Sequence, residues 1–334
     1  MDLFTPLVEE KDLHPNFRRL SDRHSEADRQ VMRQWANGFV DRDGKFVREF
    51  QTTFNSGFWE LYIFACCKEL QLHVDFKFPS PDFVIGNFHR EFSIEAVIAS
   101  NARGENAEWE RDLTALKTPP DLEAVLDTAV IRLSNAIQSK HQKYLDCYQT
   151  LPHVKGRPFV LAVGPFEQPY FWAHNDHAIR QVLFGYDRVD SSGQHLFRKL
   201  ISKTSGSVVE LGLFTSSKMA DLSAVLFSNT ATMSKVHALN SEIDELTWFS
   251  ALRFNHRGPQ PFLENASKVN YRESLLDGLY VFHNPQARYP LPFDLFNHDD
   301  ITQGTLLDGN PVPRYKCKHG HLIQRSSMLI RAKD

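Results

Sequence analysis

Residues 81–100 read PDFVIGNFHREFSIEAVIAS, and this stretch decides how the chain around it folds. Asp82 follows a proline and opens a short apolar run. Gly86 and Asn87 then form a turn signal before a second apolar run begins. Apolar runs of this length, bounded by Gly, Asn and Pro, are typical of β-strands joined by a turn. The stretch therefore predicts two neighbouring strands, 82–86 and 90–100.

The second predicted strand carries a carboxylate in its middle. Side chains alternate between the two faces of a strand, so Glu95 shares one face with Ser93 and Val97. Phe92, Ile94 and Ala96 occupy the other face. We therefore expect the sheet to bury one side of this strand completely and to direct Glu95 into the opposite side.

A helix is predicted upstream, over residues 57–70, because aromatic and aliphatic residues recur there at helical spacing. At about 100° per residue, Glu60 shares a face with Phe64 and Cys67 and lies away from the evident solvent face. Residues 72–78 are predicted as a further strand between this helix and Asp82. The order expected for this region is helix, strand, strand, strand.

Glu60, Asp82 and Glu95 thus lie where apolar neighbours predict burial. Burying an unpaired carboxylate costs several kcal/mol, so three in one region need a common positive partner, most economically a divalent cation. Each acid also has a simpler explanation. Glu60 would pair with a basic side chain, Asp82 would cap the turn after the proline, and Glu95 would lie on an exposed strand face.

A long helix and a buried strand are predicted next. Asp121 caps a helix extending to about residue 147, whose apolar stripe contains Leu126, Ala129, Leu133, Ile137 and Tyr144. Lys140 lies on the same stripe. The uniformly apolar segment 158–164 is typical of a central strand. Helices and strands alternate in this way in α/β proteins, so we expect a mixed central β-sheet flanked by helices.

The order of these acidic residues resembles the PD-(D/E)xK nuclease superfamily, which has the restriction-endonuclease-like fold. The match consists of Glu60 on a helix, Pro81-Asp82 at a strand start, and Glu95-Ala96-Val97 thirteen residues later. The resemblance implies that Asp82 and Glu95 bind Mg²⁺ or Mn²⁺, that Glu60 completes the site, and that the carbonyl of Ala96 contributes a ligand.

The chain departs from this family at Val97, where the resemblance would place a lysine. A valine neither orients a water nor offsets charge on a phosphate. Lys140 is the first candidate to replace that lysine, because a lysine within an apolar stripe needs an anionic partner. Lys77 is the second. Two other interpretations stay open: Lys140 extends its ammonium to solvent, or the site is inactive and only binds.

Composition excludes several other classes of protein. The net charge of −3 at 334 residues gives no global positive field, so any contact with nucleic acid requires a local patch. Four cysteines without a CxxC pair favour a reducing cytoplasm. No apolar run approaches the length of a membrane span. Glycine-rich nucleotide-binding motifs and the GxSxG motif are also absent.

These observations predict an N-terminal helical extension (1–50), a nuclease core (51–165) and a C-terminal α/β region (166–334) that is either separate or continuous with the core. The resemblance implies a metal-dependent nuclease of bacterial restriction or phage defence, with DNA as the expected substrate. It also implies a homodimer or a complex with a partner subunit. The rival interpretation is a catalytically silent module of the same fold that binds nucleic acid or a protein.

Overall fold

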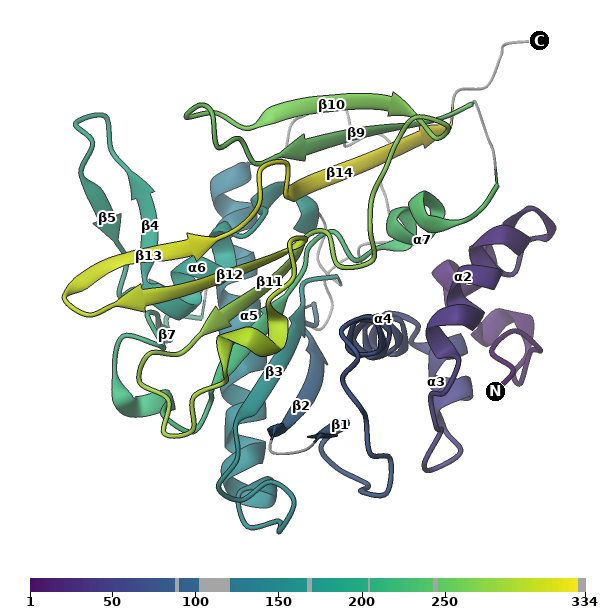
Figure 1. Cartoon of the computed structure of the whole chain (residues 1–334), viewed down its shortest axis with the longest axis horizontal. Coiled ribbons are helices and arrows are strands. Elements are labelled where there is room, and N and C mark those ends of the chain that lie inside the picture. The colour runs from purple at the N-terminus through teal and green to yellow at the C-terminus, as the bar shows by residue number, and fades with distance from the viewer. Residues whose placement is uncertain (88–89, 102–120, 167–169, 204, 243–245, 330–334) are drawn as a thin grey trace.

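A computed structural model describes residues 1–87, 90–101, 121–166, 170–203, 205–242 and 246–329. Its main feature is a seven-stranded sheet in the order β1-β2-β3-β8-β11-β12-β13 (Figure 1). The strands are β1 (Phe83–Asn87), β2 (Arg90–Ile98), β3 (Phe159–Gly164), β8 (Ala224–Phe227), β11 (Leu279–His283), β12 (Ile301–Leu307) and β13 (Asn310–Lys316).

The sheet is mixed. β1 and β2 form an antiparallel pair, and β3 lies parallel to both β2 and β8. β11 is antiparallel to β8 and parallel to β12, and β13 closes the far edge antiparallel to β12. Every residue of β3 is buried, as predicted for a central strand. The sheet joins strands from the predicted core and from the predicted C-terminal region.

Helices cover both faces of the sheet (Figure 1). They are α1 (Pro15–Leu20), α2 (Glu26–Ala36), α3 (Phe46–Thr52), α4 (Asn55–Glu69), α5 (Leu122–Lys143), α6 (His177–Phe184) and α7 (Met233–Leu239). A single-turn π-helix, Tyr144–Tyr148, continues α5. The predicted α/β class with a mixed central sheet flanked by helices is confirmed.

Two hydrophobic cores fix this arrangement. On one face, α4 packs with the N-terminal helices against Ile94 and Ala96 of β2. On the other face, α5 and α6 pack against Phe159 and Leu161 of β3, and Val97 packs against the same core. The alternation predicted along β2 is confirmed, because Ile94 and Ala96 face α4 whereas Val97 faces α5.

Smaller sheets lie around this frame. Three strands form one sheet in the order β10-β9-β14, namely β10 (Phe262–Ser267), β9 (Thr247–Arg253) and β14 (Leu322–Leu329). The pairs β4 (Tyr186–Val189) with β5 (His195–Phe197), and β6 (Leu200–Ser202) with β7 (Val208–Glu210), form two more. Among the described residues, no helix combines the length and apolarity needed to cross a bilayer.

The strand predicted over 72–78 is wrong in extent. In the segment 72–78, only Val74 forms a bridge, to Ile85 of β1. The side chain of Asp75 then accepts a hydrogen bond from the amide of Lys77, and this local turn competes with further pairing. β7 ends at Glu210, and the amides of residues 212–214 donate to carbonyls of α6, as Phe214 does to Leu183.

Candidate functional site

The β1–β2 hairpin brings two of the predicted acids together. The register pairs Phe83 with Ile94, so Asp82, one residue before β1, lies across from Glu95. Residues directly opposite one another in such a pair have Cβ atoms about 4.5–5.5 Å apart. Asp82 is half-buried, and its Oδ2 accepts a 2.7 Å hydrogen bond from the amide of Ala96. This bond ties the aspartate to the neighbouring strand.

Glu95 is almost inaccessible, with 1% of its surface exposed, so the exposed-strand interpretation is wrong. Its Oε1 accepts hydrogen bonds from the ammonium groups of Lys140 at 2.6 Å and Lys143 at 3.0 Å. Its Oε2 accepts one from the hydroxyl of Tyr148 at 3.1 Å. Both lysines lie in the last turns of α5. The buried glutamate therefore has two lysine ammonium groups and one tyrosine hydroxyl as its partners.

The ammonium of Lys140 contacts Glu95 and does not simply extend into solvent. Its side chain is 24% exposed, and its ammonium lies on Glu95. Lys143 is more exposed, at 46%, and its ammonium also lies 5.0 Å from the centre of the Tyr148 ring. The second lysine candidate, Lys77, is exposed in the segment before β1. The geometry thus selects Lys140 over Lys77 as the lysine that contacts the strand glutamate.

Glu60 approaches from the opposite helical layer, on α4, and is half-buried. Among the described residues it has no ion-pair partner, so the salt-bridge interpretation is not supported. Burial, followed by the charges of Asp82 and Glu95, raises the pKa of Glu60 to about 8. Burial and then the charge of Glu95 raise the pKa of Asp82 to about 6, against the lowering effects of the Ala96 amide and Lys140. The three acids are therefore electrostatically coupled.

The chemistry of this cluster suits a hard cation. Two carboxyl groups whose negative charges disfavour each other gain from a nearby positive charge, and carboxylate oxygens are preferred ligands of Mg²⁺ and Mn²⁺. However, in the described part of the chain no three His, Cys, Asp or Glu side chains stand close enough to share an ion. Glu95 already has both oxygens engaged. A cation held by Asp82 and Glu95 together would compete with Lys140, Lys143 and Tyr148 for the oxygens of Glu95.

Sequence reasoning missed three contributors. Lys143 and Tyr148 contact Glu95 directly, and Arg42 lies near enough for its charge to lower the pKa of both Glu60 and Asp82. Arg42 also donates to the carbonyls of Phe78 and Pro81 in the segment that leads to Asp82. A signal for Lys143 was present in the sequence, because it follows Lys140 by one helical turn.

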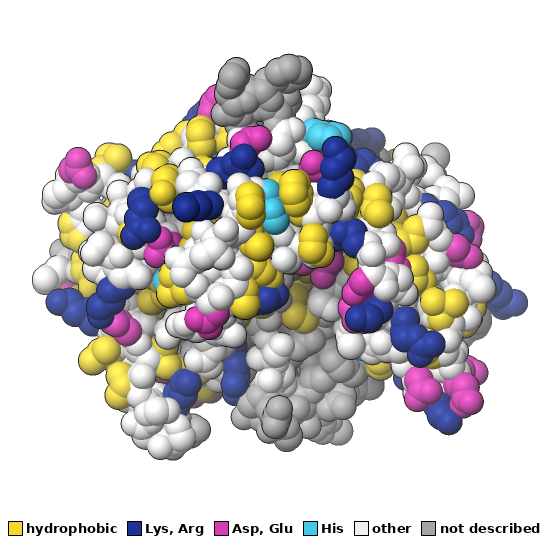
Figure 2. Space-filling model, turned by 90° about the horizontal axis from the view of Figure 1, so that it is seen from below, with side chains coloured by type: hydrophobic (Ala, Val, Ile, Leu, Met, Phe, Trp, Pro, Cys, Tyr) yellow, Lys and Arg dark blue, Asp and Glu magenta, His cyan; other side chains and the backbone are white. Residues whose placement is uncertain are grey.

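Positive charge at this end of the molecule is local. Lys140, Lys143 and Arg132 all project from α5. In contrast, Figure 2 shows a face on which Lys and Arg side chains are interleaved with Asp and Glu. This agrees with the net charge of −3. A polyanion would therefore have to be recognised by a small group of residues and not by a uniformly basic surface.

Comparisons with known proteins give no relative: no family model, curated protein or solved structure matches the chain.

Proposed function

We propose that the chain is a metal-dependent hydrolase of phosphodiester bonds in nucleic acid, with DNA as the first substrate to test. The observation that carries this proposal is the contact between Lys140 and Glu95, beside Asp82. The order of elements also supports a restriction-endonuclease-like core: α4 with its glutamate, the β1–β2 hairpin with Asp82 and Glu95, then α5, and then β3 parallel to β2.

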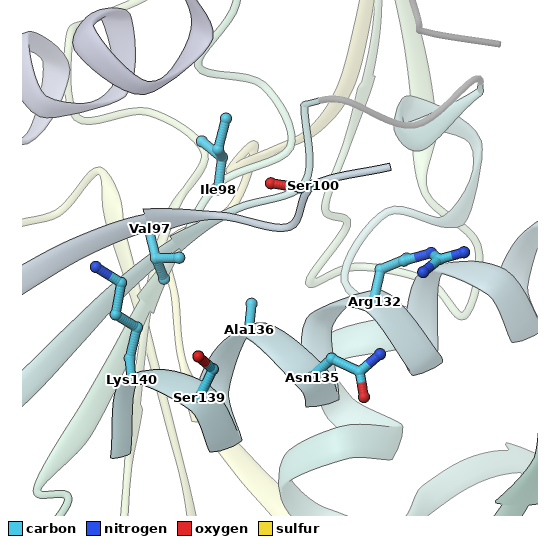
Figure 3. Close-up of a pocket in the computed structure, with 8 residues that line it drawn as sticks. All are labelled: Val97, Ile98, Ser100, Arg132, Asn135, Ala136, Ser139 and Lys140. Atoms are coloured by element: carbon cyan, nitrogen blue, oxygen red, sulfur yellow. The ribbon is translucent and has the colours of Figure 1, made fainter. Parts of the chain in front are cut away.

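The resemblance would place a lysine at the position of Val97. We propose that Lys140, on helix α5, supplies the positive charge of that lysine. Val97 and Lys140 line the same pocket, and Figure 3 shows the Lys140 side chain rising from α5 beside Val97. An ammonium so placed can stabilise charge that develops on a phosphate. The missing strand lysine is therefore no obstacle to the chemistry, because a lysine from α5 reaches the face of β2 that carries Glu95.

The other side chains have distinct roles in this proposal. Asp82 and Glu95 would hold the cation, with Glu60 and the carbonyl of Ala96 completing its surroundings. A bound Mg²⁺ or Mn²⁺ polarises the phosphate and lowers the pKa of a water. Tyr148 fixes the orientation of Glu95, and Lys143 balances its charge until a cation arrives. A role in bacterial restriction or phage defence follows from the resemblance.

Metal binding tests the proposal directly. Titration calorimetry with Mn²⁺ should give binding to the wild-type chain and none to Asp82→Asn, which loses a charged ligand of similar size. Asp146→Asn is the matched control, because Asp146 is exposed and bonds only to Gln142 among described residues. Cleavage of single- and double-stranded DNA and RNA, with Mg²⁺, with Mn²⁺ and with a chelator, is measured in parallel.

One observation favours a second candidate function. Glu95 is already paired with two lysines, so its buried charge is compensated without a cation. A catalytically silent module that binds nucleic acid or a partner protein would need nothing more. Absence of both Mn²⁺ binding and metal-dependent cleavage in the wild-type chain would select this candidate.

A further inference from the structure

A pocket of about 260 Å³ lies beside the carboxylate cluster, between the end of β2 and one face of α5. The strand side contributes Val97, Ile98 and the following Ser100. The helix side contributes Arg132, Asn135, Ala136, Ser139 and Lys140. Figure 3 shows Lys140 and Arg132 at opposite ends of this row, with the smaller helix residues between them.

The lining has the chemistry of an anion site. Among the residues that the structure describes, the lining has two cationic, three neutral polar and three apolar residues and no carboxylate. Lys203 donates a 3.1 Å hydrogen bond to Oδ1 of Asn135, which leaves the amide NH₂ of Asn135 as a donor. The side chains of Arg132, Ser139 and Ser100 are donors as well. Donors without a matching carboxylate attract phosphate oxygens.

One donor in this lining has no partner. The Nε of Arg132 is buried and makes no hydrogen bond, although a guanidinium carries five N–H donors. A buried donor without a partner is unfavourable for the folded chain. An anion in the pocket would meet the terminal nitrogens of this guanidinium, because Nε itself is shielded from solvent.

The dimensions match a strand of nucleic acid more closely than a free small molecule. Arg132 and Lys140 are eight residues apart on α5, which is about 12 Å at 1.5 Å per residue. A strand that advances about 3.4 Å per nucleotide covers this distance with roughly three nucleotides. The volume of about 260 Å³ is below the roughly 300–1,000 Å³ of pockets that enclose drug-sized ligands, so a strand would lie along the pocket with most of each nucleotide outside it.

We infer that this pocket holds the sugar-phosphate backbone of a single nucleic-acid strand on its way to the carboxylate cluster. This inference rests on the proposed function, because Lys140 belongs to both the pocket and the cluster. Arg132 binds a phosphate two or three nucleotides from the one beside Glu95, and Val97, whose side chain faces α5, contacts a sugar. The pocket lies between a helix and a strand, so it admits one strand and excludes a duplex.

Binding without cleavage tests the inference. Fluorescence anisotropy is recorded with labelled single strands of about 12 nucleotides and with the matching duplex, in the presence of a chelator. We expect the wild-type chain to prefer the single strand. Arg132→Ala should weaken binding about tenfold or more and lower the slope of log affinity against log salt by about 0.7, the value for one lost phosphate contact.

Control variants isolate the role of Arg132. Arg132→Lys keeps the charge and should retain most of the salt slope, with reduced affinity. Arg48→Ala, an exposed arginine on α3 in the N-terminal helical layer, should behave as the wild type. Labelled strands with and without a 5′-phosphate should bind equally, because the proposed contact is to the backbone. Thermal unfolding of each variant confirms that the chain is folded.

The outcomes separate this inference from the proposed function. If the wild-type chain binds a single strand but cleaves no nucleic acid, and Arg132→Ala weakens that binding, the inference is supported and the proposed hydrolase function is wrong. Metal-dependent cleavage with unchanged binding and KM in Arg132→Ala keeps the hydrolase and overturns the inference. Three other results also overturn the inference. They are equal affinity for duplex and single strand, binding that requires a terminal phosphate, and no binding by the wild-type chain.

Discussion

The ammonium of Lys140 lies 2.6 Å from Oε1 of Glu95, although the two residues are 45 positions apart and come from α5 and β2. Glu95 retains only 2% of its side-chain surface, so the pair is largely withdrawn from water. Breaking a buried pair leaves an uncompensated charge, which costs more than the loss of a surface pair. The contact therefore fixes the relative position of helix and strand as well as the charge at the site.

The first prediction concerns Lys140 itself. Lys140→Ala should lower metal-dependent cleavage by about 10²-fold or more, the scale of losing one preorganised donor. Lys143 keeps Glu95 paired, so the variant should still unfold cooperatively. Lys218→Ala is the control, because Lys218 also pairs with a glutamate, Glu210, at 2.6 Å. Cleavage rates of purified variants decide, and equal rates for Lys140→Ala and wild type would contradict the proposed role.

A second prediction follows from the raised pKa of Glu60. Its pKa is about 8 in the folded chain and near 4.5 without the fold. Between these values the folded state binds more protons than the unfolded state, so the free energy of unfolding falls as pH rises from about 4.5 to about 8. Asp82 adds the same trend between 3.8 and about 6. Above about 8 these contributions become constant.

Urea denaturation at pH 5 and pH 8 checks this trend. Glu60→Gln should lose less stability over that interval than the wild type, because glutamine has no proton to release. Glu69→Gln, an exposed glutamate on the same helix, should follow the wild type. Mg²⁺ should raise the unfolding midpoint at pH 8 more than at pH 5, since the cation binds the charged form. Parallel pH profiles for wild type and Glu60→Gln would refute the coupling.

Local patterns were sufficient to predict the elements that carry the acids. The alternation along β2 and the apolar stripe of α5 depend on near neighbours, and both appear in the structure. Lys140 could be found because a lysine within an apolar stripe needs a partner. The pairing of β3 with β8, and of β8 with β11, joins segments far apart in sequence. No periodicity within one segment specifies such partners.

Tyr148 shows why one residue of the site was missed. The amide of Gln149 bonds to the carbonyl of Tyr144, five residues earlier, so the chain follows π-helical rather than α-helical spacing there. Helical periodicity at 3.6 residues per turn therefore assigns the wrong orientation to positions after Lys143. Tyr144 stacks on Phe159 in the core, with ring centres 4.5 Å apart. It is Tyr148 that reaches Glu95.

The third prediction separates these two tyrosines. Burial and the charge of Glu95 raise the pKa of the Tyr148 hydroxyl, which therefore remains a neutral donor. Tyr148→Phe removes this donor and should lower kcat about tenfold with little change in KM, because the orientation of Glu95 is lost but the substrate contacts remain. Tyr144→Phe keeps the stacked ring and should retain wild-type kcat. Equal kcat values for the two variants would exclude a positioning role for Tyr148.

The last prediction tests whether Lys140 replaces a lysine of the strand. Val97 lies two residues after Glu95 on the same face of β2, and it lines the pocket together with Lys140. A lysine introduced at Val97 has the length to bring its ammonium to the position that Lys140 occupies. In the Lys140→Ala background, Val97→Lys should therefore restore cleavage to within about tenfold of wild type. Val97→Met, which fills similar space without charge, should restore nothing. Val97→Lys alone should be no more active than wild type, since a third ammonium group would then compete with those of Lys140 and Lys143 for Glu95. The cleavage rates of the four variants are compared at one metal concentration. The prediction is wrong if the variant with both Lys140→Ala and Val97→Lys is folded and binds Mn²⁺ but is as inactive as Lys140→Ala. In that case the helix lysine does not replace a strand lysine.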